Sequence, residues 1–345
     1  MAEMAAMQYI LIIILASFAA TNTIAQTYSE TDSIVKRYGG KFWSPEKLAD
    51  RINGDFSNDS IKARAIYTWI ATYVGYDTRK YQLMQKRKYR DRLKARSRSF
   101  NITEYRKGVA KATLRRRLGV CGEYSILFHR LCELTNVSCE IVIGNAKTTP
   151  EEIGRFPMGT DHAWNVVNIN GRWRLVDATW GAGYVERETM KFVRSFDSTF
   201  FFTPPDLFFR HHFARDKRWL LIDGNDSAFA ALPLYHSLRQ DIVLIKPLHG
   251  VVAIKSKDGV SFEFNGNGEH RWSYFYHKGK EKWQQYPDVT VDGNNIRFLV
   301  PGSVRANDFL TICCDGSSLV TFKIRSRKFL RTPFAGGVGN NLARN

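Results

Sequence analysis

Cys121, His162 and Asp177 belong to the three residue types that supply a nucleophile, a base and an orienting acid in cysteine enzymes. Cys121 directly precedes an apolar stripe of helical spacing that ends near Asn136, so we expect it at the first turn of a buried helix. A helix start favours a thiolate, because unpaired backbone N–H groups and the positive end of the helix dipole stabilise negative charge. The sequence therefore predicts a nucleophilic thiol at residue 121.

A predicted hairpin brings the base and the acid together. Its arms are Ala163–Ile169 and Arg172–Thr179, and they are joined by Asn170-Gly171, which is typical of a two-residue type I′ turn. Opposite residues of the two arms then have numbers that sum to 341, so His162 and Asp177 become diagonal neighbours on one face of the hairpin. Their Cα atoms would lie roughly 7–8 Å apart, which a hydrogen bond between imidazole and carboxylate can bridge.

Spacing alone leaves a structural alternative open for these residues. Cys121 would then be a buried small residue, and Asp177 would be an acid that caps a turn. Glu123, two residues after the cysteine, would oppose thiolate formation if it faced the site, although an acid in the first turn also stabilises the helix.

Two tryptophans border the predicted site, and we expect Trp164 and Trp180 to wall a substrate groove, whereas Trp173 is expected in the core. The adjacent His211 and His212 lack a third ligand at a recognised spacing. We therefore predict neither a metal nor a cofactor.

The remaining cysteines are too few to indicate a disulfide-scaffolded protein. Structural thiols are expected at Cys132 and Cys139, and a disulfide between them stays open if the compartment is oxidising. Cys313 and Cys314 are neighbours in a predicted strand and point to opposite faces, so a bond between them would be strained.

The chain has 345 residues and a net charge of +18, most of which lies in one segment. Residues 79–117, called the basic segment here, contain sixteen Lys and Arg and two acids, for a net charge of +14. We interpret the basic segment as a long loop, with broken helical pieces, that is either solvated or docks on an anionic envelope polymer or lipid surface. Nucleic acid is a less favoured partner, since no RNA-binding signature accompanies the charge.

The N-terminus contains an apolar run at residues 9–20, which is shorter than the roughly 20 residues needed to span a bilayer. Small residues at positions 23 and 25 fit a signal peptidase site, so we expect a signal peptide at 1–25 and a secreted, periplasmic or cell-envelope location. Residues 1–8 contain no Lys or Arg, which leaves an uncleaved anchor as the alternative.

The rest of the chain divides into a domain at 26–232, a β-sandwich at 233–330 and a disordered tail at 331–345. In the first domain, apolar residues at helical spacing predict a helix from Asp59 that ends at Gly75. Short alternating segments separated by Gly, Asn and Asp predict the strands of the sandwich. These strands are Ile242–Ile245, Val260–Phe264, Trp272–Tyr276, Val289–Val291, Ile296–Val300, Phe309–Cys313 and Leu319–Ile324.

Two longer motifs resemble the core of the transglutaminase-like superfamily. They are GVCGEYSILFHRLCE at 119–133 and DHAWNVVNINGRWRLVDATWGAG at 161–183, and they occur in the order typical of that superfamily. Further matches at FFTPP (201–205), His212-Phe213 and Trp219-Leu220-Leu221 resemble the branch that contains the kyphoscoliosis peptidase. The resemblance covers Ile61–Asp223.

The resemblance implies an α+β fold with a papain-like, transglutaminase-like core, in which the cysteine-bearing helix packs on an antiparallel sheet. The all-β sandwich predicted from the strand pattern follows this core. The resemblance also implies that Cys121 is the nucleophile, His162 the base and Asp177 its orienter, acting on a protein or peptide substrate. We expect an exported cysteine enzyme that hydrolyses amide bonds through a thioester. The alternatives are a cross-linking transglutaminase and a non-catalytic envelope adaptor on the same scaffold.

Overall fold

The computed structural model describes residues 26–87, 101–186, 188–254, 259–266, 269–277, 284–301 and 309–326. The predicted signal peptide and the predicted disordered tail lie outside these ranges. Within them, no helix combines the length and apolar character that a membrane crossing requires.

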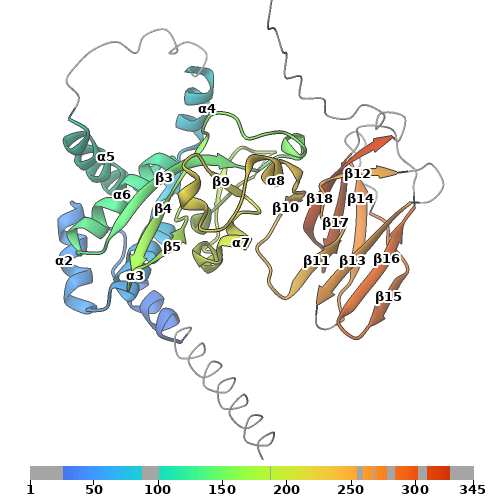
Figure 1. The fold of residues 1–345 in the computed structure, drawn as a ribbon. Helices are drawn as coiled ribbons and strands as arrows, with labels where there is room; N and C mark the ends of the chain where they lie inside the picture. The colour runs from blue at the N-terminus through green and yellow to red at the C-terminus, as the bar shows by residue number, and fades with distance from the viewer. Residues whose placement is uncertain are drawn as a thin grey trace, which may run out of the picture. The chain divides into compact units, whose positions relative to one another are not determined.

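Two compact units make up the chain (Figure 1). Of the described residues, the first unit contains those up to Asn145, Thr160–Phe208 and Ala214–Leu221. The second contains Ala146–Gly159, Phe209–Phe213 and the described residues from Ile222 onward. This division differs from the predicted boundary between residues 232 and 233, because two earlier segments cluster with the later strands.

The first unit contains helices that precede and follow the predicted nucleophile in the chain. They are residues 26–37, α2 (Pro45–Asp55), α3 (Asp59–Tyr73), α4 (Thr78–Arg87), α5 (Ile102–Arg116), α6 (Cys121–Leu134) and α7 (Pro205–Phe208). The helix predicted from Asp59 is confirmed as α3, which begins where the side chain of Asn58 accepts hydrogen bonds from the N–H groups of Ser60 and Ile61. The chain leaves α3 after Tyr73, before the predicted end at Gly75.

The basic segment was interpreted as a long loop with broken helical pieces, but most of its described residues form two regular helices, α4 and α5. Asn101 caps α5 by accepting from the N–H groups of Thr103 and Glu104, and Arg115 and Arg116 stabilise the negative end of the helix dipole. Ala110, Thr113 and Leu114 form a buried face at helical spacing. This stripe has only three residues among many charged ones, so the apolar pattern did not predict the helix, although Lys, Arg and Ala are good helix formers.

A five-stranded sheet supports the cysteine-bearing helix α6. Its order is β8-β5-β4-β3-β9, built from β8 (Phe201–Thr203), β5 (Arg172–Val176), β4 (His162–Ile169), β3 (Cys139–Ala146) and β9 (His212–Ala214). β3, β4, β5 and β8 pair antiparallel, and α6 packs against β4. The predicted arrangement of a cysteine-bearing helix on an antiparallel sheet is confirmed.

Two short strand pairs complete the unit and fix the segment before Cys121. β1 (Gly75–Tyr76) pairs in parallel with β2 (Leu118–Gly119), while β6 (Gly183–Val185) pairs with β7 (Phe192–Arg194). Arg194 of β7 donates hydrogen bonds to the carbonyl oxygens of residues 71, 72 and 74 at the end of α3. This cation therefore stabilises the helix terminus from which β1 departs.

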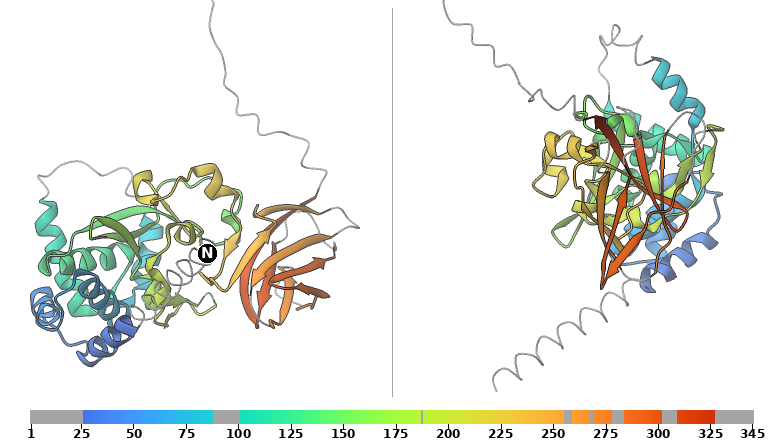
Figure 2. Two further views of the ribbon diagram at one scale, coloured as in Figure 1. Left: turned by 60° about the horizontal axis from the view of Figure 1, so that its bottom comes forward. Right: turned by 90° about the vertical axis from the view of Figure 1, so that its right-hand side faces the viewer.

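The second unit contains a β-sandwich (Figure 2). One sheet has the order β10-β18-β17-β14, with β12 also pairing with β18, and the other has the order β11-β13-β16-β15. The strands are β10 (Leu234–Tyr235), β11 (Ile242–Lys246), β12 (Val251–Ile254), β13 (Val260–Gly266), β14 (Trp272–Tyr276), β15 (Val289–Asp292), β16 (Asn295–Val300), β17 (Phe309–Cys314) and β18 (Ser317–Ser326). Phe262 of one sheet meets Phe322 of the other with ring centroids 5.2 Å apart, inside a shared apolar core. Each predicted strand is present, while β10 and β12 were not predicted.

Candidate active site

Cys121 is the first residue of α6, as predicted, and its side chain is partly exposed. Val120 precedes the helix in an extended conformation. The N–H groups of the first turn of an α-helix have no partner within the helix, so they place partial positive charge around the thiol.

The hairpin has the predicted turn and register. Asn170 and Gly171 both have positive φ angles, of 52° and 80°, as a type I′ turn requires. Asn165 faces Val176 across the strands, so the paired residues sum to 341 as predicted. His162 and Asp177 consequently lie on the same face.

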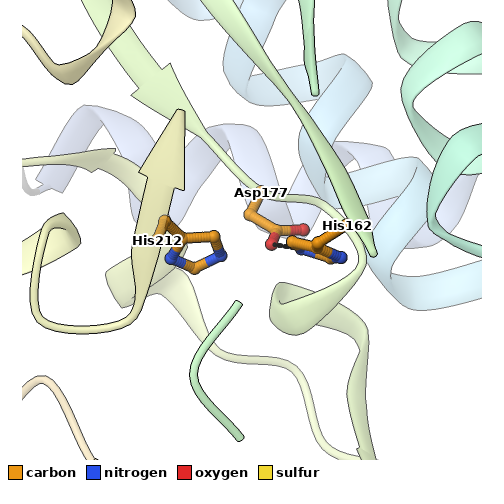
Figure 3. A group of neighbouring side chains, drawn as sticks. All are labelled: His162, Asp177 and His212. Atoms are coloured by element: carbon orange, nitrogen blue, oxygen red, sulfur yellow. Dashed lines mark hydrogen bonds and ion pairs between the residues drawn. The ribbon is translucent and has the colours of Figure 1, made fainter. Parts of the chain in front are cut away.

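The His162 ring and the Asp177 carboxylate face each other at hydrogen-bond distance (Figure 3). His162 Nε2 lies 2.6 Å from Asp177 Oδ2, and both side chains are buried. Asp177 Oδ1 accepts from the backbone N–H groups of Thr179, at 2.8 Å, and Trp180, at 3.1 Å. The turn after Asp177 therefore binds one carboxylate oxygen, Oδ1, and the other, Oδ2, binds the imidazole of His162.

The thiol and the imidazole shift each other's protonation. Burial raises the pKa of Cys121, but the hydrogen bond from His162 and its positive charge outweigh burial, and the pKa falls below the usual 9.0. Burial likewise lowers the pKa of His162, but the charge and hydrogen bond of Asp177, with the contact to Cys121, raise it to about 10. Both shifts favour a thiolate beside an imidazolium, which is the reactive form of a cysteine nucleophile.

The two predicted substrate-lining tryptophans occupy different positions. Trp164 is 1% exposed, packs beside His162 with ring centroids 5.9 Å apart, and therefore cannot line an open groove in this structure. Trp180 is partly exposed, and its ring also lies 5.9 Å from that of His162. The Trp164 ring meets that of Phe208, with centroids 5.7 Å apart, so its buried position differs from the expected groove wall. The substrate-binding roles of Trp164 and Trp180 stay predictions.

Tyr76 is a neighbour of the nucleophile that sequence reasoning did not place there. Burial raises its pKa above the usual range, and the negative charge of the Cys121 thiolate adds to this effect. The position follows from the parallel pairing of Tyr76 with Gly119, two residues before the cysteine. A two-residue bridge has no periodic signal in sequence, so only the fold reveals it.

All five cysteines are free thiols, so the disulfide left open between Cys132 and Cys139 is absent from the structure. Cys132 is buried on α6, and burial with the neighbouring Cys139 raises its pKa well above the usual value. The structural role expected of both thiols stays a prediction.

In the part of the chain that the structure describes, two groups bring three possible metal ligands together. One of them, His162 with Asp177 and His212, contradicts the expectation that His212 lacks a third ligand. His211 Nε2 lies 2.9 Å from the carbonyl oxygen of Tyr235, and His212, labelled in Figure 3, is buried on β9. His270, Cys314 and Asp315 bring three ligand atoms within 4.8 Å, but the Arg239 guanidinium lies 3.7 Å from both Cys314 Sγ and Asp315 Oδ2. That positive charge repels a cation.

The Gly181→Ala variant should be destabilised by about 1–3 kcal/mol, because the turn that holds Asp177 has no room for a methyl group. An added Cβ at Gly181 would overlap the hydroxyl of Tyr67, which donates to the carbonyl oxygen of Asp197. Urea unfolding would measure the loss, and Tyr67→Phe in the same chain should restore part of it. Stability unchanged by Gly181→Ala would contradict this packing.

The comparisons with known proteins agree with this geometry. Residues 46–178 match the family model of the transglutaminase-like superfamily. Human kyphoscoliosis peptidase is 30% identical over 294 residues, which cover 81% of this chain and 41% of that protein. The mouse protein of the same name is 29% identical over 262 residues (71% and 36%), and hillarin of Drosophila melanogaster is 28% identical over 205 residues (53% and 25%). The chain thus spans less than half the length of each of these relatives.

Proposed function

The chain carries a domain of the transglutaminase-like superfamily, and from this premise we propose that it is a cysteine peptidase in which Cys121 attacks amide bonds. The observation that carries the proposal is the hydrogen bond of 2.6 Å between His162 and Asp177, together with the contact of His162 to the thiol. A buried carboxylate that orients an imidazole next to a helix-start cysteine is the arrangement that nucleophilic acyl transfer needs.

The reaction proceeds in two halves. The Cys121 thiolate forms a C–S bond to the amide carbonyl carbon, and the backbone N–H of Cys121 donates to the resulting oxyanion. His162 gives its proton to the amine as the C–N bond breaks, which leaves a thioester. Water then attacks the thioester and passes one proton to His162, and the C–S bond breaks to release the thiolate and the carboxylic acid product, which loses its remaining proton to solvent.

Hydrolysis is proposed over cross-linking for the second half. The same three residues serve either acceptor, water or an amine, and among the residues that the structure describes no amine-binding pocket is identified at the site. Proteins of this superfamily act on protein substrates, and two relatives bear the name peptidase.

Alkylation of Cys121 by iodoacetamide tests the proposal without a known substrate. We expect an apparent pKa below 9.0, because His162 favours the thiolate, and labelling should slow as the pH falls through that value. His162→Ala removes the cation while burial still opposes the thiolate, so labelling at pH 7 should slow by about tenfold or more, one pKa unit being tenfold. Hydrolysis of a peptide substrate should also decline above about pH 10, where His162 loses its proton.

Peptide mass spectrometry resolves the label on each cysteine. Cys139, a partly exposed thiol of β3, serves as the internal reference. Equal and slow labelling of Cys121 and Cys139, unaffected by His162→Ala, would overturn the enzyme proposal and favour the adaptor.

Export and an anionic partner are further parts of the proposal. An apolar N-terminal run with small residues at 23 and 25 supports a secreted, periplasmic or cell-envelope location. The exposed Lys111 and Arg115 of α5 support electrostatic docking of the basic segment on an anionic polymer or lipid surface. Binding that persists unchanged in high salt would contradict the electrostatic contact.

A further inference from the structure

Glu123, in the first turn of α6, is a buried acid close to the nucleophile. Its Oε1 atom lies 2.6 Å from Lys80 Nζ and 3.3 Å from Arg116 Nη2. Its Oε2 atom accepts from the backbone N–H of Val120, at 3.0 Å. One carboxylate therefore binds two cations and the residue that immediately precedes Cys121.

The two cations come from opposite ends of the basic segment. Lys80 lies in the first turn of α4, and Arg116 is the last residue of α5. Asp77 holds the Lys80 end, since its Oδ1 accepts from the Lys80 N–H at 2.8 Å and its own N–H donates to the Gly119 carbonyl at 2.8 Å. Figure 1 shows α5 lying beside α6. Through Lys80 and Arg116, both ends of the basic segment contact the first turn of α6.

The turn from Gly119 to Cys121 is closely packed against the side chain of Glu123. A Cβ added to Gly119 would lie 3.0 Å from Glu123 Cβ and 3.3 Å from Glu123 Oε2. The carboxylate therefore fills the space beside this turn and fixes the direction in which the chain enters α6.

We propose that Glu123 is a positioning residue, which clamps α4 and α5 to the Gly119–Cys121 turn and thereby holds the Cys121 sulfur against His162. The inference rests on the proposed function, and it assigns the two described ends of the basic segment, at Lys80 and Arg116, to the framework of the site. Lys80 and Arg116 neutralise the Glu123 carboxylate, so its charge opposes the thiolate little.

The clamp requires a carboxylate rather than an amide of the same shape. A carboxylate accepts hydrogen bonds at both oxygens, whereas glutamine has one accepting oxygen and one donating NH₂ group. In Glu123→Gln, the NH₂ group must face either the two cations or the Val120 N–H, and each of these is a donor. The variant therefore breaks one half of the clamp while it preserves side-chain volume.

Alkylation of Cys121 by iodoacetamide across pH 5–10 tests the clamp in the full chain. We expect Glu123→Gln to raise the apparent pKa of the thiol by about one unit, which slows labelling at pH 7 about tenfold, because a loosened turn weakens the contact with His162. Lys80→Met should slow labelling in the same direction, by about threefold. Circular dichroism would establish that each variant is folded.

The sign of the shift separates positioning from simple charge. If Glu123 only opposed the thiolate, its neutralisation would lower the thiol pKa and speed labelling, and that result, or an unchanged profile, would overturn the inference. Glu133→Gln is the matched control, since Glu133 is an exposed acid near the other end of α6, and it should label as the wild type does. A wild-type Cys121 without a lowered pKa would instead count against the proposed function itself.

Discussion

The Asp177→Asn variant should lose roughly 10³- to 10⁴-fold in kcat/KM for peptide hydrolysis while it keeps its fold, by analogy with the same change in serine protease triads. The substitution is nearly isosteric, and the two backbone N–H groups of Thr179 and Trp180 that now bind Oδ1 will select the amide oxygen for that position. The amide NH₂ group then faces His162 Nε2.

The expected loss follows from the tautomer of His162. With an NH₂ donor opposite, Nε2 must accept a hydrogen bond, so the ring proton moves to Nδ1. Nδ1 then carries a proton on the side that serves Cys121 and cannot take the proton of the thiol. The variant would keep the hydrogen bonds of residue 177, but His162 could no longer act as the base for Cys121.

Steady-state kinetics with a peptide substrate of the wild-type enzyme would measure the effect. Asp216→Asn is a suitable control, because Asp216 is an exposed capping acid of the same unit that is far along the chain from the triad. A folded Asp177→Asn enzyme within tenfold of wild-type kcat/KM would refute the orienting role.

The Asp32→Ala variant should lose about 3–5 kcal/mol of unfolding free energy, because it leaves a buried guanidinium without its counter-charge. Asp32 accepts from Arg64 Nε at 2.8 Å, from Arg64 Nη2 at 2.6 Å and from Thr68 Oγ1 at 2.5 Å. Asp32 and Arg64 are 8% and 4% exposed, so water cannot replace the lost carboxylate.

Aromatic rings surround the same guanidinium and make its removal from water more complete. The Arg64 Cζ atom lies 5.0–5.6 Å from the ring centroids of Phe201, Tyr28, Tyr67 and Phe196. The pair thereby joins the helix at 26–37 to α3 and to the segment around β8.

Urea unfolding followed by tryptophan fluorescence would test this prediction. Replacing both partners, Asp32→Leu with Arg64→Met, should cost less than Asp32→Ala alone, since no buried charge remains. Asp50→Ala removes the acid of an exposed pair 3.9 Å from Lys47 and should change stability by less than about 0.5 kcal/mol. Equal losses for the buried and the exposed acid would contradict the argument.

The differences between the sequence-based predictions and the structure share a physical origin. They concern contacts between residues that belong to different elements of the chain. The charge of the basic segment obscured α5, whose buried face of Ala110, Thr113 and Leu114 becomes apparent only against α6. Trp164 was expected to line a groove, yet its surroundings depend on Phe208, from a different element. Glu123 was recognised as an acid near the nucleophile, but its cationic partners lie 43 and 7 residues away.

Local rules were enough for the parts of the site that lie in one turn or one hairpin. The Asn170-Gly171 dipeptide determined the register that aligns His162 with Asp177, because a two-residue turn leaves only one pairing. The apolar stripe after Cys121 determined that the thiol begins a helix. Tertiary structure alone decided that Tyr76, Lys80 and Arg116 converge on that helix start, since parallel bridges and ion pairs between separate helices depend on how the chain packs and leave no periodic pattern in its sequence.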